Sequence, residues 1–238
     1  MNGQLTVRLL RCGLCGTPLP VTGRSAAFQC EACHNHWIIS GDSLAPLQVW
    51  RAAPPEGFPG EPVFLPFWVI EADGAGIRGG IEAAMEGRPV TERAETTRQD
   101  RELSHLSARI GDGTFRIFVP AFHPANTLAH IKIGKLLTEC QPSFRARRQT
   151  EPDRPVMCSL DAAEAARLVD FIFIATLPES IQRCGDFVER LRLNTSPAPR
   201  MVELPFERRG ASLRSLYGGF EISGRIADES IPAESAAR

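Results

Sequence analysis

Two short cysteine motifs, CGLCG at residues 12–16 and CEACH at residues 30–34, organise the N-terminal part of this chain. In each motif two residues separate the cysteines, and 14 residues lie between the pairs. A two-residue gap allows one tight turn to direct two sulfurs at one ion, and two such turns supply a tetrahedral set of four thiolates. The spacing predicts a zinc ribbon that holds one structural Zn²⁺ through Cys12, Cys15, Cys30 and Cys33.

The segment between and after the motifs also fits a ribbon. Residues 19–22 and 26–29 can form short strands on either side of a turn, which would bring Cys30 back beside Cys12. Gly16 directly follows the first pair, where a sharp turn favours a residue free to adopt a positive φ. Phe28 and Trp37 would cover the small core around the second motif.

Cysteines spaced in this way also occur in redox sites, in disulfides and in haem attachment. A thioredoxin-like redox site needs one Cys-x-x-Cys in a βαβ context, which is missing here. Disulfides are disfavoured in a cytosolic chain. Residues 30–34 match a c-type haem attachment signature, but that reading requires export and leaves Cys12 and Cys15 unexplained. His34 and His36 are interpreted as neighbours of the zinc site, because four thiolates already close the shell.

A closed four-thiolate site has no position for water or substrate, so the predicted zinc is structural and not catalytic. Its binding would contribute on the order of 10 kcal/mol to the folding of a ribbon that has almost no core of its own.

Net charge and hydropathy exclude several classes of function and location for the chain. The 238 residues carry 27 basic and 28 acidic side chains, a formal charge of −1, which argues against a chain held to nucleic acid or anionic lipid by bulk charge. The longest strongly apolar run, residues 168–177, is interrupted by Asp170 and is too short to span a bilayer. No signal-peptide pattern precedes the first cysteine, so a cytoplasmic location without direct membrane insertion is expected.

The composition along the chain divides it into four parts. We expect a zinc ribbon at residues 1–50, a Pro- and Gly-rich linker at 51–62, a mixed α+β domain at 63–224 and a flexible tail at 225–238. The fold class predicted for the whole chain is therefore α+β, with a small N-terminal four-cysteine ribbon.

The apolar strand VFLPFWVI at residues 63–70 is the most distinctive element of the second part. Because Pro66 cannot donate to a ladder, this strand is expected at a sheet edge or at a bulge. An apolar edge needs covering, so Phe64, Phe67 and Trp68 become candidate partner-binding residues, although such residues are more commonly buried.

Further elements follow from periodicity and turn residues. We expect a strand at 115–120, a helix over 127–139 capped by Asn126, and a helix from Leu160 capped by Ser159. The polyampholyte stretch 78–109 fits either a charged helical excursion or a surface insertion. Strands are expected at 201–206 and 216–223, and LPF at 204–206 repeats LPF at 65–67, a weak hint of an internal duplication that would set two similar strands side by side.

No catalytic constellation is recognisable. His105, His123 and His130 are scattered, and no phosphate loop, nucleophile elbow or paired-carboxylate motif is present. The remaining cysteines, Cys140, Cys158 and Cys184, are interpreted as small buried hydrophobic residues.

Taken together, the two cysteine motifs, LPFW at 65–68, VPAF at 119–122 and LPF at 204–206 resemble an uncharacterised group of bacterial proteins. That group has an N-terminal zinc ribbon of the transcription-factor-IIB type and a downstream Leu-Pro-Phe-Trp strand domain. Its members often continue into transmembrane helices and are thought to act as scaffolds for membrane-associated assemblies. This chain departs from that pattern, since it has no such helices.

The function that we expect is therefore a non-enzymatic zinc-ribbon interaction or scaffold protein with an unidentified protein partner. The alternative is a nucleic-acid-binding accessory factor that uses the ribbon and the basic stretch of Arg145, Arg147 and Arg148. The ribbon itself is nearly neutral, which makes this alternative the less favoured one.

Overall fold

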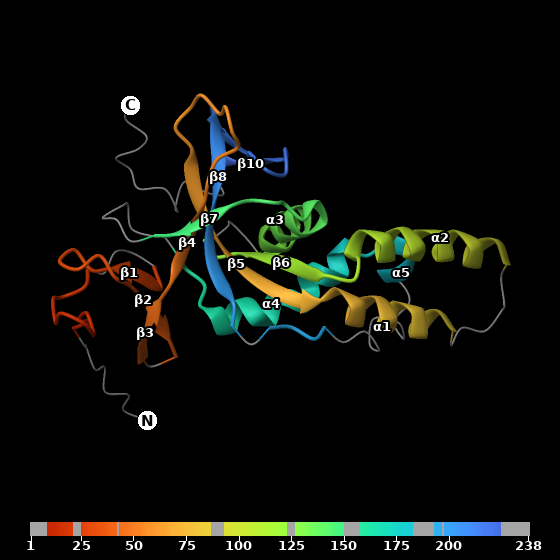
Figure 1. Ribbon diagram of the computed structural model, residues 1–238, viewed down its shortest axis with the longest axis horizontal. Coiled ribbons are helices and arrows are strands. Elements are labelled where there is room, and N and C mark those ends of the chain that lie inside the picture. The colour runs from red at the N-terminus through yellow and green to blue at the C-terminus, as the bar shows by residue number, and fades with distance from the viewer. Residues whose placement is uncertain are drawn as a thin grey trace.

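A computed structural model describes residues 9–20, 25–41, 43–86, 93–122, 127–149, 158–182, 193–196 and 198–224 (Figure 1). A three-stranded antiparallel sheet comprises β1 (Ala27–Gln29), β2 (His36–Ser40) and β3 (Ser43–Leu47). A seven-stranded sheet comprises β4 (Val49–Ala52), β5 (Val63–Asp73), β6 (Thr114–Pro120), β7 (Ala146–Arg148), β8 (Arg200–Arg209), β9 (Ser212–Ser215) and β10 (Glu221–Ser223). The helices are α1 (Gly74–Glu86), α2 (Arg93–Ile110), α3 (Thr127–Cys140), α4 (Ala162–Thr176) and the short α5 (Glu179–Gln182). The predicted α+β class is confirmed.

Strand β5 has a strand on each side over Phe67–Val69, so the expected edge position is wrong for this part, whereas residues 63–66, which include Pro66, pair with β8 alone. It pairs antiparallel with β6 over Phe67–Asp73 and with β8 over Val63–Val69. Pro66 is tolerated because it lies just beyond the β6 ladder, where its carbonyl accepts from the Ala121 N–H at 2.9 Å. The Ala121 carbonyl, deprived of a donor at Pro66, accepts instead from the Ser159 N–H at 2.7 Å.

The two LPF segments lie side by side in the structure. Strands β5 and β8 are antiparallel, and the register places Leu65 directly opposite Leu204. The rings of Phe67 and Phe206 are stacked with centroids 6.2 Å apart. Each proline carbonyl accepts a backbone N–H from a neighbouring strand or loop, and for Pro205 the donor is Leu216 at 3.2 Å. The predicted adjacency is present; whether a duplication produced it stays a hypothesis.

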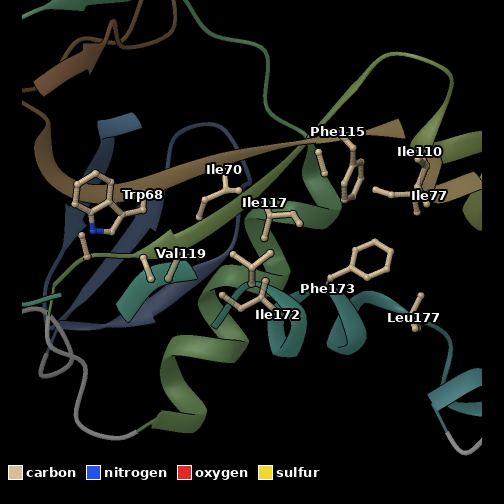
Figure 2. Packing of buried hydrophobic residues seen from close by; sticks show 14 of the residues in the cluster. Trp68, Ile70, Ile77, Ile110, Phe115, Ile117, Val119, Ile172, Phe173 and Leu177 are labelled. Atoms are coloured by element: carbon tan, nitrogen blue, oxygen red, sulfur yellow. The ribbon is translucent and has the colours of Figure 1, made fainter. Parts of the chain in front are cut away.

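The two faces of the sheet bury separate apolar clusters because side chains alternate along β5. Leu65, Phe67 and Val69 face one cluster, and Trp68 and Ile70 face the other. Figure 2 shows the second cluster, in which α4 packs beneath β5 and β6. Helix α4 begins with a capping box between Asp161 and Glu164, so the expected cap at Ser159 is wrong by two residues.

The ribbon and the larger sheet share one core and are not joined by a linker. Strand β4 follows β3 after a single residue and pairs with both β8 and β7, so the larger sheet takes in residues on both sides of the expected boundary at 50/51. Ala27 and Ile38 of the ribbon belong to the same buried cluster as Trp68. The Pro- and Gly-rich residues 53–62 connect β4 to β5 instead.

The polyampholyte stretch is a helical excursion between β5 and β6. Helices α1 and α2 extend away from the sheet as an arm (Figure 1). Ile77 and Ile81 of α1 and Leu103 of α2 are buried in the cluster that continues under the sheet, while none of the charged side chains described in these helices is buried.

The C-terminal strand prediction is partly wrong. The expected strand 216–223 is replaced by β9 at 212–215 and β10 at 221–223, since Gly218 and Gly219 lie in a turn, and Gly219 has a φ of 67°. Asn126, His123, Cys184 and the tail 225–238 lie outside the described residues.

Gly134 in α3 provides a test of how closely the helices pack. A Cβ at this position would lie 2.6 Å from both Ile172 Cδ1 and the Phe118 carbonyl. We expect Gly134→Ala to lower the free energy of unfolding by about 1–3 kcal/mol through overpacking. Gly79→Ala in α1 is the matched control, because nothing lies within 4 Å and the same change should be neutral or stabilising by up to about 1 kcal/mol. Urea denaturation of both variants measures the contrast, and equal effects would contradict it.

Candidate metal centre

The first cysteine motif forms a tight knuckle. The Gly16 N–H donates to the Cys12 carbonyl at 2.9 Å, and the Cys12 N–H donates to the Thr17 carbonyl at 2.8 Å. Gly16 has a φ of 75°, the left-handed conformation that glycine adopts without steric cost. The turn directs both sulfurs of the motif to one side of the chain.

The second motif repeats this geometry with a different residue at the left-handed position. The His34 N–H donates to the Cys30 carbonyl at 2.8 Å, and the Cys30 N–H donates to the Asn35 carbonyl at 2.9 Å. His34 has a φ of 57° and corresponds to Gly16 of the first knuckle. The backbone role of His34 agrees with its prediction as a neighbour of the site rather than a ligand.

The four sulfurs converge. Cys12 Sγ lies 3.5 Å from Cys33 Sγ, Cys15 Sγ lies 3.5 Å from Cys30 Sγ, and all four lie within 4.8 Å of one another. Disulfide sulfurs would be about 2.05 Å apart, whereas tetrahedral Zn–S bonds of about 2.3 Å place sulfurs about 3.8 Å apart. The cluster can therefore hold one metal ion with four thiolates, and its spacing fits zinc.

Burial and hydrogen bonding distinguish the four thiols. Cys12 and Cys30 are buried, whereas Cys15 is exposed. Hydrogen bonding with the Thr17 side chain lowers the pKa of Cys15 to about 6, and burial raises the pKa of Cys30 to about 11. The Asn35 side-chain amide lies 3.4 Å from Cys33 Sγ as a donor, and this interaction lowers the pKa of Cys33. Such donors stabilise thiolates, which are the metal-binding form of cysteine.

Two aromatic side chains line the cluster, as predicted from the sequence. Phe28 is buried in the small ribbon core with Cys12, Leu19 and Cys30. Trp37 lies directly over Gly13, where a Cβ would approach the indole Cη2 to 2.6 Å. Any larger residue at Gly13 would displace this indole from the knuckle.

A buried ion pair lies on the larger sheet, close to the point where the chain passes from the ribbon into that sheet. Arg51 Nε on β4 donates to Glu203 Oε2 on β8 at 2.7 Å, and the two side chains are only 14% and 5% exposed. The guanidinium also lies 4.5 Å from the centroid of the Phe64 ring. Sequence reasoning did not find this pair, because 152 positions separate its members.

His36 on β2 is affected by the same cation. Burial, with a smaller contribution from the charge of Arg51, lowers the pKa of His36 to about 4. Its ordinary value is about 6.5, so between pH 4 and 6.5 the unfolded chain binds more protons than the folded one. Stability should therefore rise with pH across this window and be lost as the pH falls.

We expect His36 to contribute up to about 3 kcal/mol to this acid destabilisation. The measurement is urea denaturation of the wild type and of His36→Gln from pH 4 to 7. Zinc release at acid pH affects both proteins, so the difference between their pH slopes isolates the imidazole. Parallel slopes would contradict the assignment.

The candidate partner residues on β5 lie mainly in the core. Phe67 and Trp68 are 0% and 3% exposed, and Phe64 is half-buried against Arg51. Trp68 Nε1 donates to the Leu160 carbonyl at 2.8 Å. The expectation of an exposed aromatic surface is wrong for Phe67 and Trp68, because the core clusters on the two faces of the sheet bury them.

The basic stretch is ordered and accessible. Arg147 and Arg148 belong to β7, Arg145 precedes it, and all three side chains are exposed. In the register β7 pairs with β4, so Arg147 lies opposite Arg51 and Arg148 opposite Trp50. The three arginines therefore lie on or directly before the strand next to β4, which continues from the ribbon.

A cleft of about 670 Å³ lies between the helices, away from the cysteines. His105 and Arg109 of α2, Lys135 and Glu139 of α3, and Glu179 of α5 line it. Lys135 is engaged with Glu139 at 3.7 Å, and the Arg109 side chain donates to the Thr176 carbonyl at 3.3 Å. Cationic and acidic side chains both line the cleft. This arrangement favours neither an anionic nor a cationic ligand.

Comparison with known proteins finds no relative of this chain. No protein-family model, no curated protein and no solved structure matches the chain. Among the described residues, no helix combines the length and apolar character needed to cross a membrane.

Proposed function

We propose that this protein is a non-enzymatic interaction or scaffold protein whose ribbon is held by one structural Zn²⁺. The observation that carries the proposal is the four-cysteine cluster, built from two matched knuckles with sulfurs 3.5 Å apart in pairs. Four cysteines leave no coordination position for substrate, so the ion would contribute to the fold and not to a reaction.

The contacts between the ribbon and the larger sheet support the same interaction or scaffold role. The Ala26 N–H donates to the Cys158 carbonyl at 2.5 Å, and Ala27 and Ile38 pack in the core of the larger sheet. A ribbon fixed in this way would present a constant surface to a partner. The proposal includes membership of the bacterial zinc-ribbon group that the sequence resembles, and a cytoplasmic location.

Metal analysis of the purified chain tests the zinc site. One zinc per chain is expected, and Cys12→Ser with Cys15→Ser should remove it. Cys140→Ser, at an exposed thiol outside the cluster, is the matched control and should leave the zinc content unchanged. A metal content below one tenth of an ion per chain in the wild type, after refolding with Zn²⁺, would sink the structural-zinc proposal.

Nucleic-acid binding is the second candidate, supported by the exposure of Arg145, Arg147 and Arg148 on and beside one strand. Phosphate contacts release counterions, so binding to DNA or RNA should weaken steeply with salt. Retention on a DNA column at about 50 mM salt, lost by about 200 mM, would favour this function. Passage without retention at low salt would end it.

A further inference from the structure

We infer that β7 is a docking edge for an extended acidic peptide segment of a partner protein, which would add a strand to the seven-stranded sheet. The inference rests on the interaction role proposed above and names the site and the chemistry of the partner.

Among the described strands, β7 is the last on its side of the sheet, and one of its edges pairs with no described residue. Ala53 donates to the Arg145 carbonyl at 2.9 Å, and Gln149 donates to the Val49 carbonyl at 2.8 Å, so the odd-numbered residues face β4. The N–H and C=O groups of Ala146 and Arg148 therefore point away from β4. Both residues are exposed, and these groups have no hydrogen-bond partner within the described chain.

Two other sheet edges, those of β6 and β1, are closed by specific contacts. On the outer edge of β6, the Gln141 side chain accepts from the Arg116 N–H at 3.0 Å and donates to the Arg116 carbonyl at 2.7 Å. The Phe118 N–H donates to Thr138 Oγ1 at 3.1 Å. The β1 edge donates to the Cys158 carbonyl through Ala26 and Ala27. In contrast to the β6 and β1 edges, β7 has backbone N–H and C=O groups that can pair with a partner strand.

The side chains on β7 select the charge of that strand. Arg145 and Arg147 project on one face and Arg148 on the other, and none of them makes an ion pair with a described residue. Five other arginines in the described chain have an acidic partner. These pairs are Arg51–Glu203, Arg78–Asp112, Arg98–Glu102, Arg200–Glu71 and Arg209–Glu207.

An added strand would bring its side chains opposite those of β7. Residues directly opposite in neighbouring strands have Cβ atoms about 5 Å apart, and opposite charges there attract while like charges repel. Glutamates at alternate positions would therefore meet Arg145 and Arg147. A purely apolar strand would leave the arginines without acidic partners, so their presence disfavours indiscriminate edge-to-edge association.

The edge favours a peptide over a nucleic acid. An extended peptide can satisfy both the free N–H and the free C=O groups of Ala146 and Arg148, whereas phosphates accept hydrogen bonds but cannot donate them. Three arginines alone also supply few of the phosphate contacts that nucleic-acid binding needs at physiological salt.

The test uses the full zinc-loaded chain and a fluorescein-labelled octapeptide of alternating glutamate with valine or threonine, followed by anisotropy. Arg147→Glu replaces attraction by repulsion and should weaken binding about tenfold or more. Arg167→Glu, at an exposed arginine on α4, is the matched control and should change it less than about twofold. Ala146→Pro removes one outward N–H without removing a bond to β4, and should also abolish binding.

Two N-methylated versions of the peptide separate strand pairing from charge alone. Methylation of every second amide blocks either the side that faces β7 or the side that faces solvent, so one version should lose binding and the other should keep it. Equal binding of the two versions would overturn the proposal, as would no binding of the parent peptide. Tighter binding of a 12-nucleotide oligothymidylate to the same arginines would overturn it in favour of nucleic acid.

Zinc content and urea denaturation of each variant keep this proposal separate from the proposed function. A chain that retains its zinc and its stability but does not bind the peptide refutes the docking edge and does not affect the structural-zinc proposal. A chain that binds the peptide and keeps its full stability without zinc in the ribbon supports the edge and refutes the structural-zinc role.

Discussion

Replacing Cys12 and Cys15 by serine should unfold the ribbon and also destabilise the seven-stranded sheet. Ala27 and Ile38 of the ribbon are 3% and 6% exposed and lie in the core cluster that includes Trp68 and Met201. If the ribbon unfolds, these side chains leave the cluster, and the sheet loses one wall of its core. The effect of a local site is therefore expected throughout the chain.

The expected loss is about 5 kcal/mol or more in the free energy of unfolding, because structural zinc contributes on the order of 10 kcal/mol to the fold that binds it. Tryptophan fluorescence separates the two parts, since Trp37 reports on the ribbon and Trp68 on the sheet. We expect Trp37→Phe proteins, whose signal comes from Trp50 and Trp68, to show the same loss when zinc is removed by a chelator.

Cys140→Ser is the control for the loss of a thiol and should change stability by less than about 0.5 kcal/mol. A sheet transition unchanged by zinc removal would show that the ribbon is an independent unit, contrary to the shared core described here.

Glu203→Ala should be the most damaging single substitution in the larger sheet. Glu203 is 4% exposed and lies between β4 and β5, where its carboxylate accepts from Arg51. Removal of the acid leaves the guanidinium buried beside Phe64 and His36 with its main counter-charge lost. Breaking a buried ion pair in this manner costs about 3–5 kcal/mol.

The double variant Arg51→Met with Glu203→Leu supplies the matched comparison. Both charges are then removed, so most of the stability should return, because apolar replacement of a whole buried pair is often neutral or stabilising. Urea denaturation of the single and double variants gives the coupling between the sites. A double variant as unstable as Glu203→Ala would show that packing, and not the unpaired charge, causes the loss.

The metal cluster was predictable because the residues that specify it lie close together in the sequence. Two residues between cysteines specify a knuckle, and the gap between Cys15 and Cys30 allows only a short return of the chain. The aromatic residues Phe28 and Trp37 were identifiable for the same reason, since they flank the second knuckle closely in sequence. Strands β5 and β6 and helix α3 were also found, because their hydrophobic patterns are long and bounded by clear turn residues.

The arrangement of these strands was not predictable, because it depends on partners that are remote in sequence. Pro66 suggested an edge or a bulge for the whole strand, yet β5 gains a second neighbouring strand from Phe67 onward, and Ser159 supplies the donor that Pro66 lacks. Ser159 is thereby used for the sheet, and the helix begins with Asp161, an equally suitable cap. Single-sequence patterns cannot distinguish two neighbouring residues that can both fill the same role.

The pairing of Arg51 with Glu203 is a second such case. Each residue occupies a strand in which a charged side chain would ordinarily face solvent, and only the register between β4 and β8 brings them together. The partner residues proposed on β5 failed for a related reason, since Phe67 and Trp68 are apolar enough for either a surface or a core. Both are buried because each faces a core cluster, Trp68 on one face of the sheet and Phe67 on the other.

The insertion of β8 between β4 and β5 has a consequence for how the protein is made. Residues 49–52 and 63–73 leave the ribosome long before residues 200–209, and at about 5–20 residues per second they wait several seconds for the strand that joins them. The cysteine knuckles emerge earliest and need no distant partner, so the nascent chain can acquire its metal first. Until β8 arrives, β4 and β5 each lack the neighbour that separates them, and this interval is when the nascent chain is most exposed to aggregation.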